Sequence, residues 1–185
     1  MPAYVLEILV VSLGLVLLMV EAFMPPKVPK RVIGYAAAIG LGVVFVLLFF
    51  VTGKPEGSEH VFWTVYTASS SALFYKGFAL ITTIIVLLIA KDYTPVLRKY
   101  IGSGSEKSDA GLGEFYCIPV FVCAGLMWMA SAIDLISIFV SLELVTISFY
   151  VLVAYMRRNV GSLEAGTKYL ILGALSTGFL VYGLA

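Results

Sequence analysis

The chain alternates long apolar runs with short polar connectors. A helix that crosses the hydrocarbon core of a bilayer needs about 20 apolar residues, and six runs come close to that length. The predicted membrane helices span residues 3–23, 32–52, 73–90, 115–132, 135–155 and 165–185. Only a short break around Ala132 to Asp134 separates the fourth run from the fifth. The pattern therefore predicts an all-α, polytopic transmembrane bundle of about six helices.

Composition supports a lipid environment. Hydrophobic residues make up 61% of the chain and charged residues only 12%, with a mean hydropathy of +1.04. Soluble domains are about half apolar and about a quarter charged, so these charges are too few to cover a surface exposed to water. The net charge is only +1 and no basic tract occurs. We therefore expect the lipid bilayer as a partner and no nucleic acid.

The distribution of Lys and Arg predicts the orientation of the helices. The first, third and fifth connectors together hold nine of these residues, whereas the second and fourth hold one, Lys54. Because basic connectors stay on the cytoplasmic side, the N-terminus is predicted outside, and six helices return the C-terminus there. The chain stops within an apolar run, so we expect a truncated bundle, part of a larger polypeptide.

The connectors add little chemistry. The longest, residues 91–114, is rich in Gly, Ser and charge at its centre, which predicts a flexible cytoplasmic loop. The second begins polar and then becomes rich in strand-forming residues between Val61 and Thr67. His60 is the single histidine and falls in this connector. With no phosphate loop, CxxC pair or Ser/His/Asp set either, we expect no metal, cofactor or redox centre in this chain.

Glu143 is the main candidate for chemistry. It lies eight residues after Leu135 and twelve before Tyr155, which places it about 12 Å and about 18 Å from the two helix ends, near the bilayer centre. A charged carboxylate there costs at least a few kcal/mol, and intramembrane acids are by default functional candidates. Thr146 and Tyr150 share its helix face. The alternative is a neutral Glu143 that hydrogen-bonds a neighbouring helix as a structural contact.

Lys168 is the second candidate. It lies about 5 Å into the last helix, and Glu164 stands four residues earlier, in favourable spacing for a local ion pair. The alternative is a lysine that reaches the membrane interface with this local partner and has no further role. The predicted depths of Lys168 and Glu143 differ by about 13 Å, so a direct pair is not expected. Glu143 then needs either water or a basic partner from beyond this chain.

The remaining residues of interest have structural interpretations. Glu7 and Glu21 are expected to reach the membrane interface from the two ends of the first helix, and Lys76 from the outer end of the third. Asp134 is expected to cap the fifth helix. Three further features are predicted to serve only packing: a seam of small residues in the second helix (Gly34, Ala38, Gly42), a serine stripe in the fifth (Ser137, Ser141, Ser148), and unpaired core cysteines (Cys117, Cys123).

The last two predicted helices resemble a known family. The matching stretches are residues 130–135, 141–144, 148–154, 164–169, 172–178 and 182–183. They resemble subunit N among the antiporter-like membrane subunits of the proton-pumping NADH:quinone oxidoreductase, respiratory complex I. The resemblance is close over about residues 115–185 and looser before. It implies an antiporter-like fold of fourteen helices, of which this chain holds the N-terminal portion.

The resemblance also implies functional residues. Glu143 matches the family's key carboxylate of the fifth helix, and Lys168 matches the lysine that opens the sixth. The family's later lysines have no counterpart here. One departure concerns the third helix, where the family pattern has an acid seven positions before Lys76 and this chain has Ser69. The departure leaves Lys76 without a role implied by the family.

The function implied by the resemblance is that of a non-redox membrane-arm subunit of NADH:quinone oxidoreductase, a translocase. The subunit would take part in proton translocation coupled to NADH oxidation and quinone reduction elsewhere in the complex. Its expected partners are the other membrane-arm subunits of complex I, in a bacterial plasma (inner) membrane. Two alternatives are a subunit of a multi-subunit cation/proton antiporter and a structural or assembly membrane subunit.

Overall fold

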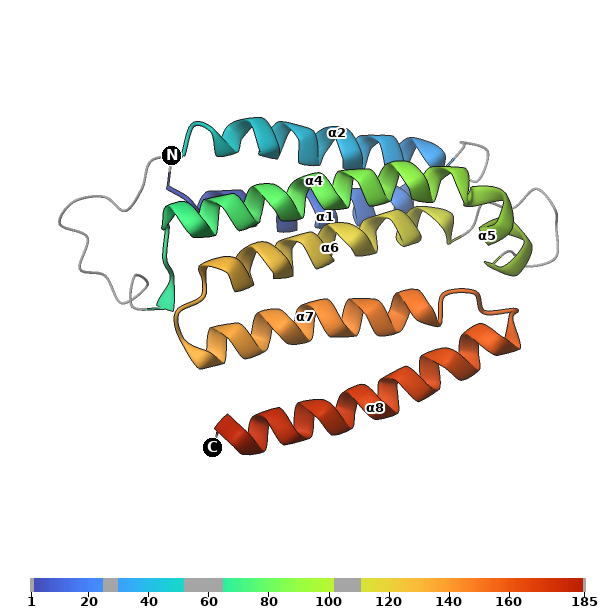
Figure 1. The fold of residues 1–185 in the computed structure, drawn as a ribbon. Coiled ribbons are helices and arrows are strands. Elements are labelled where there is room, and N and C mark those ends of the chain that lie inside the picture. Colours follow the sequence, from blue (N-terminus) through green and yellow to red (C-terminus); the bar gives the residue numbers. More distant parts are fainter. Residues whose placement is uncertain (1, 25–29, 52–64, 102–110, 185) are drawn as a thin grey trace.

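The helical bundle predicted from the sequence is confirmed. The computed structural model describes residues 2–24, 30–51, 65–101 and 111–184, and within them six helices are long and apolar enough to cross a membrane (Figure 1). These helices are α1 (Tyr4–Phe23), α2 (Arg31–Leu48), α4 (Ser70–Asp92), α6 (Leu112–Ser131), α7 (Leu135–Val153) and α8 (Val160–Leu184). The polypeptide is thus a multi-pass membrane chain whose helix boundaries lie within a few residues of those expected.

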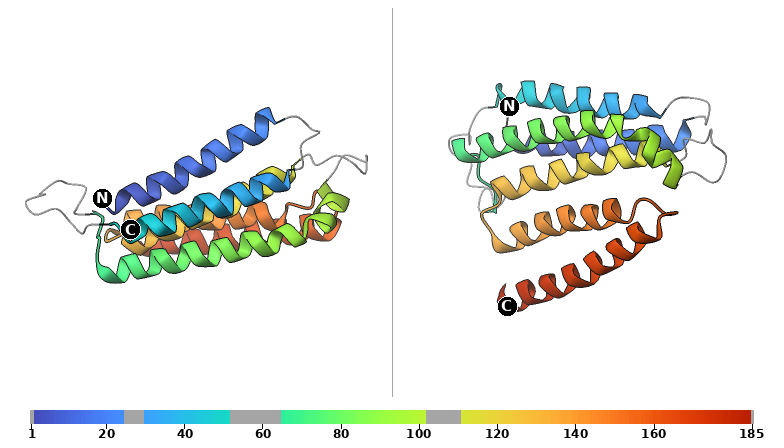
Figure 2. Two further views of the ribbon diagram at one scale, coloured as in Figure 1. Left: turned by 90° about the horizontal axis from the view of Figure 1, so that it is seen from above. Right: turned by 45° about the vertical axis from the view of Figure 1, so that its right-hand side comes forward.

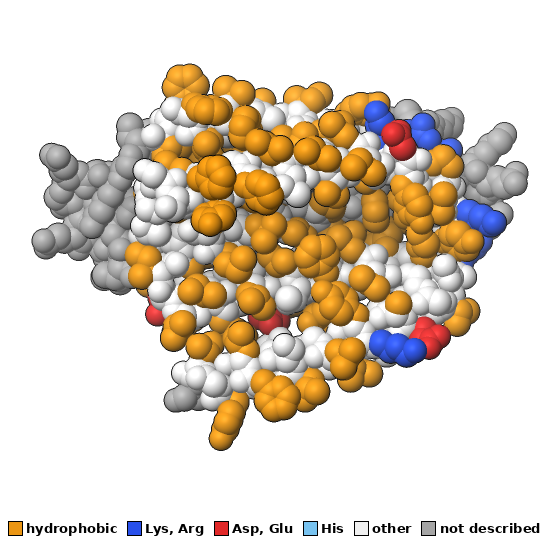
Figure 3. Space-filling model, viewed as in Figure 1, with side chains coloured by type: hydrophobic (Ala, Val, Ile, Leu, Met, Phe, Trp, Pro, Cys, Tyr) orange, Lys and Arg blue, Asp and Glu red, His pale blue; other side chains and the backbone are white. Residues whose placement is uncertain are grey.

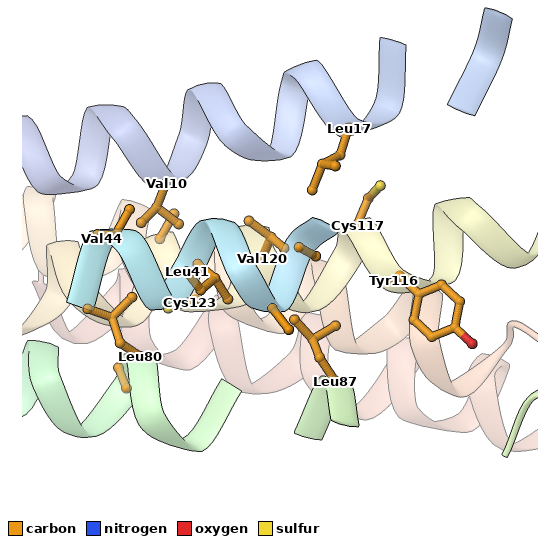
Figure 4. Packing of buried hydrophobic residues seen from close by; sticks show 14 of the residues in the cluster. Val10, Leu17, Leu41, Val44, Leu80, Leu87, Tyr116, Cys117, Val120 and Cys123 are labelled. Carbon is orange, nitrogen blue, oxygen red and sulfur yellow. The ribbon is translucent and has the colours of Figure 1, made fainter. Parts of the chain in front are cut away.

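The helices form a tight core and a looser outer layer. Helix α6 packs against α1, α2, α4 and α7, whereas α8 packs mainly against α7 (Figures 1 and 2). Apolar side chains from α1, α2, α4 and α6 meet in one cluster, which includes Val10, Leu41, Leu80 and Val120 (Figure 4). Since almost all of α8 is exposed, its position depends chiefly on its contact with α7.

Small residues allow the core helices to approach closely, as the sequence predicted for part of α2. Gly34 and Ala38 are buried, and a Cβ on Gly34 would lie 3.2 Å from the ring of Tyr116. The prediction is wrong for Gly42, where a Cβ would meet no atom within 4 Å. The seam is therefore shorter than expected, because α2 turns its later small residue away from its neighbours.

The prediction that the two cysteines are unpaired core residues is confirmed. Cys117 and Cys123 are both buried and neither forms a disulfide. Both belong to the apolar cluster between α1, α2, α4 and α6 (Figure 4). They act as small core side chains.

The break between α6 and α7 is held from both sides. Asp134 accepts a hydrogen bond from the backbone N–H of Ile136 at 3.0 Å, which confirms it as the cap of α7. Residues 65–67 lie beside the break, and Tyr66 forms an isolated antiparallel bridge with Ala132. The N–H of Thr67 donates to the Ser131 carbonyl at 2.7 Å. A piece of the second connector therefore fixes the point where α7 begins.

Helices extend into both ends of the third connector. Helix α4 continues to Asp92, a short helix α5 (Thr94–Ile101) follows, and α6 begins at Leu112. Both ends of the expected flexible loop 91–114 are thus helical, and only its centre, like His60, lies outside the described residues. Helix α5 is anchored by Thr94, whose hydroxyl lies 2.7 Å from the Tyr116 hydroxyl inside the bundle.

The expectation that Glu7 and Lys76 reach the interface is wrong. Their side chains are 3% and 0% exposed, and the Lys76 ammonium lies 2.7 Å from the Glu7 carboxylate. Lys76 also donates to the Tyr66 hydroxyl at 2.6 Å, and Tyr66 donates to Glu7 at 3.0 Å. Burial and the charge of Glu7 raise the pKa of Tyr66, which keeps its phenol protonated as a donor. The ion pair between α1 and α4 supplies each charge with its opposite.

The expectation of reaching the interface is also wrong for Glu21, at the other end of α1. Its carboxylate lies 2.8 Å from the Lys30 ammonium, and both side chains are buried. Lys30 also donates to the backbone carbonyl of Glu21 at 3.3 Å. The carboxylate fits only because Gly113 of α6 lies beside it, where a Cβ would collide with an oxygen of Glu21.

Positive charge gathers at one end of the bundle, which we call the basic end. It is the end where α1 finishes and α2 begins, and Figure 3 shows the visible Lys and Arg side chains concentrated there. Among the described residues it holds every Lys and Arg except Lys76: Lys30, Arg31, Lys91, Arg98, Lys99, Arg157, Arg158 and Lys168. This segregation is the pattern that the positive-inside rule associates with the cytoplasmic face.

The buried group formed by Glu7, Tyr66 and Lys76 generates a prediction about stability. Lys76→Met leaves the Glu7 carboxylate buried without a counter-charge, which is expected to lower the free energy of unfolding by about 3–5 kcal/mol. The double variant Lys76→Met with Glu7→Gln removes both charges and should recover most of that loss. Unfolding of the chain in mild detergent measures both. Lys99→Met, at an exposed lysine of α5, is the control and should stay close to the unchanged chain; equal losses in the single and double variants would contradict the prediction.

Candidate functional site

A cavity with several polar side chains in its wall lies between α6, α7 and α8. Its volume is about 930 Å³, and most of its wall is apolar. The polar side chains of the wall come from four segments: Glu114 from α6, Glu143 and Tyr150 from α7, Tyr155 and Arg157 from the connector, and Thr167 and Thr177 from α8. The cavity therefore extends from the basic end to the middle of α7, a helix path of about 16 Å from Ala154 to Glu143.

Glu143 lies at the inner end of this cavity. The residue is half-buried and sits near the middle of α7, as its sequence position predicted. One carboxylate oxygen, Oε1, accepts a hydrogen bond from the Thr177 hydroxyl of α8 at 2.8 Å. None of the Lys or Arg side chains in the described part of the chain forms an ion pair with it. Its only side-chain partner there is a neutral hydroxyl.

The predicted polar stripe around Glu143 is only partly a lining of the cavity. Tyr150 lines it and stacks edge-on with Tyr169 at 5.0 Å between ring centroids. Thr146 instead donates to the backbone carbonyl of Glu143 at 3.1 Å. On the other side of α7, Ser141 and Ser148 are buried, as expected for a stripe that packs against a neighbour.

Lys168 forms the local pair that its spacing predicted. Its ammonium lies 2.6 Å from the Glu164 carboxylate, and both side chains are mostly exposed (70% and 62%). Lys168 precedes Thr177 by nine positions on α8, or about 13 Å along the axis. It therefore does not meet Glu143, in agreement with the depth difference expected from the sequence.

Three residues at the basic end of the cavity escaped the sequence analysis. Glu114 lies 4.0 Å from Arg157, and Tyr155 donates to Glu114 at 3.3 Å and to the Gly111 carbonyl at 2.5 Å. Burial, then the nearby Glu114, raise the pKa of Tyr155, so its hydroxyl stays protonated. Glu114 belongs to α6, whereas Tyr155 and Arg157 belong to the connector after α7. No local pattern in the sequence marks Glu114 as their neighbour.

The described residues contain no group of three His, Cys, Asp or Glu side chains placed to hold a metal ion. The acids that line the cavity, Glu114 and Glu143, lie at its two ends, on α6 and at mid-α7. What the arrangement offers chemically is a set of groups that bind or pass protons: two carboxyls, two phenols and two hydroxyls along one hollow.

Comparisons with known proteins agree with this geometry. The family described as "NADH:quinone oxidoreductase/Mrp antiporter, TM" matches residues 132–185, the segment that forms α7 and α8. NADH-quinone oxidoreductase subunit N from Heliobacterium modesticaldum is 37% identical over 97% of this chain, and the subunit from Trichlorobacter lovleyi is 38% identical over 97%. The chain covers 35% and 34% of these relatives, or about a third of their length.

The fold also has a solved counterpart. A chain of respiratory complex I from Thermus thermophilus with bound aureothin superposes with a TM-score of 0.69 over 96% of this chain and 35% of that chain, at 22% identity. This likeness shows the fold. Together with the relatives above, it confirms the resemblance that the sequence indicated.

The contact between α7 and α8 generates a prediction. A Cβ on Gly166 would lie 2.6 Å from the Cβ of Ala154 and 3.1 Å from its Cα, so Gly166→Ala must push the two helices apart. We expect this substitution to lower the free energy of unfolding of the chain in detergent by about 1–3 kcal/mol. Gly178→Ala is the matched control, because nothing lies within 4 Å of that position, and it should be neutral or slightly stabilising. Equal stability of the two variants would contradict the close approach.

Proposed function

The chain is a relative of NADH-quinone oxidoreductase subunit N, and we propose that it serves proton translocation in the membrane arm of such a complex. In this proposal the complex as a whole is the translocase that couples NADH oxidation and quinone reduction to proton transport. This chain contributes no redox step. Its part is to bring protons into the membrane interior and to hold them there.

One observation carries the proposal. Glu143 places a carboxyl group at mid-helix, on the wall of a cavity that leads from the basic end, with a hydroxyl as its only side-chain partner in the described part of the chain. The acids of the core, Glu7 and Glu21, each pair with a lysine, and Glu143 does not. The hydrogen bond to α8 also fits the structural alternative, which the Glu143→Gln variant below separates from a role in proton transport. An acid without a fixed counter-charge can instead change its charge when its surroundings change.

The proposed path begins at the basic end, which we assign to the cytoplasm. Water in the cavity, assisted by the hydroxyls of Thr167 and Tyr150, would carry a proton inward to Glu143. A lysine on a later helix of the whole protein would then compete with that proton for the carboxylate, as the resemblance implies. We propose that Lys168, beside Glu164 at the basic end, takes part by setting the local charge there.

The remaining parts of the proposal concern context. We propose that the partners are the other membrane-arm subunits of the complex, and that NADH and quinone bind elsewhere in it. The location would be the plasma (inner) membrane of a bacterium, which is supported by the bacterial sources of the relatives.

A cation/proton antiporter is the second candidate. It is favoured by one observation: the description of the matched family names the Mrp antiporter beside the oxidoreductase. The same carboxyl and cavity would serve either function, because both need an acid that exchanges charge within the membrane.

The role of Glu143 can be tested in the assembled complex. Glu143→Gln cannot take up a proton, so NADH-driven proton pumping by inverted membrane vesicles should fall by about tenfold or more, whereas Glu143→Asp should keep part of it. Fluorescence quenching of a pH-sensitive dye measures the pumping. Asp92→Asn, at an exposed acid at the end of α4, makes the same carboxylate-to-amide change and should pump normally. Full pumping by Glu143→Gln would remove Glu143 from the path.

The two candidate functions separate in the same vesicles. Pumping that needs NADH and a quinone, and is insensitive to sodium, is expected for the oxidoreductase subunit. Sodium-driven proton exchange without NADH would instead identify an antiporter.

A further inference from the structure

Thr177 differs from most hydroxyl residues of the membrane helices, because its hydroxyl donates to a side chain of another helix. Serine and threonine in a helix commonly donate to a backbone carbonyl three or four residues earlier. The hydroxyls that do so here are those of Ser12, Thr82, Thr83, Ser141, Thr146, Ser148 and Thr167. Thr177 instead donates across to α7, to the carboxylate of Glu143 at 2.8 Å. Its hydroxyl is directed at a partner that the sequence analysis singled out.

The packing of α8 on α7 brings this contact about. Gly166 lies against Ala154, and Gly173 lies so close to Tyr150 that a Cβ would collide with the phenol. Further along, Thr177 meets Glu143. These pairs advance along α8 as they retreat along α7, as expected for antiparallel neighbours. Two glycines therefore set the helix separation that lets a short threonine reach the carboxylate.

We propose that Thr177 is a positioning residue that favours the ionised form of Glu143 and turns its carboxylate into the cavity. The proposal rests on the proposed function of Glu143 as a proton carrier. A hydroxyl donates a stronger hydrogen bond to a charged carboxylate than to a neutral carboxylic acid. With Glu143 protonated, the hydroxyl can return to the carbonyl of Gly173, four residues earlier on its own helix.

This exchange of partners by the Thr177 hydroxyl links the charge of Glu143 to the packing of α8 on α7. Among the described residues, the Glu143–Thr177 bond is the one side-chain hydrogen bond between the central parts of α7 and α8; the other link, from Ser162 to the Val153 carbonyl, lies at the basic end. Protonation of Glu143 therefore weakens the hold of α7 on the distal half of α8. The mechanism gives the carboxyl a way to signal its state to the helix that follows it.

Other groups around the cavity could also respond to pH. They are Glu114 and Cys117 on α6, Tyr150 on α7, and Tyr155 and Arg157 in the connector, while α1 contributes only Leu18. All of them are retained when Thr177 is changed, so a difference between variants reports the hydroxyl of Thr177.

Infrared spectroscopy tests the proposal without using transport. The full chain is placed in phosphatidylcholine vesicles, and the protonated-carboxyl band that Glu143→Gln abolishes is followed as pH is varied. Thr177→Val removes the hydroxyl at nearly equal volume. We expect about tenfold more of Glu143 to be protonated at a given pH in this variant, as loss of a hydrogen bond to a charged group predicts. The helical amide band in the same spectra reports folding.

Two controls make the result decisive. Thr177→Ser keeps the hydroxyl and should follow the unchanged chain. Thr82→Val makes the same substitution on α4, where the hydroxyl bonds its own helix, and should leave the Glu143 band unaltered. An unchanged titration in Thr177→Val, or an equal shift in Thr177→Ser, would overturn the assignment to the hydroxyl. Such a failure would not bear on proton pumping, which is tested separately by Glu143→Gln.

Discussion

The organisation of this bundle follows from the cost of placing a charge in a medium without water. A charged side chain between membrane helices needs a partner that restores what hydration would have supplied. Glu7 and Lys76 meet that need for each other, as do Glu21 and Lys30. Each pair joins segments that are separate in the chain, so the same interactions that neutralise the charges also define how the core helices fit together.

Glu143 stands apart because no Lys or Arg side chain of the described residues pairs with it. Its described side-chain partner is the neutral hydroxyl of Thr177, whereas Glu7 and Glu21 each pair with an ammonium group. The difference matches the two layers of the fold. The buried ion pairs belong to the tight group of α1, α2, α4 and α6. Glu143, which has no ion pair among the described residues, belongs to the looser layer of α7 and α8, where the cavity lies.

The match to known proteins follows the same division. The family match falls on residues 132–185, the layer that holds Glu143, Thr177 and Lys168. The relatives are about three times longer than this chain. In the proposed function, the cation that Glu143 lacks here comes from a helix beyond those described, so the looser layer is also where further helices would be expected to act on it.

The sequence by itself determined features that depend on position along one helix. Run lengths located six membrane helices, the depth of Glu143 followed from its place between two helix ends, and the Lys168–Glu164 pair followed from a four-residue spacing. The short side chain of Asp134 reaches the start of its own helix, so its capping role was also readable. Each of these depends on the rise and turn of a single helix, which are nearly constant.

Only the tertiary structure decided which helices are neighbours and which faces they turn toward each other. Apolar residues cover all sides of a membrane helix, so the hydrophobic pattern that orients a helix in a soluble protein carries little information here. The burial of Glu7 and Lys76, the meeting of Thr177 with Glu143, and the residues at the mouth of the cavity were therefore not foreseen. The burial of Glu21 beside Gly113, and the approach of α8 to α7 through Gly166 and Gly173, depend on glycines whose role appears only when another helix or side chain lies against them.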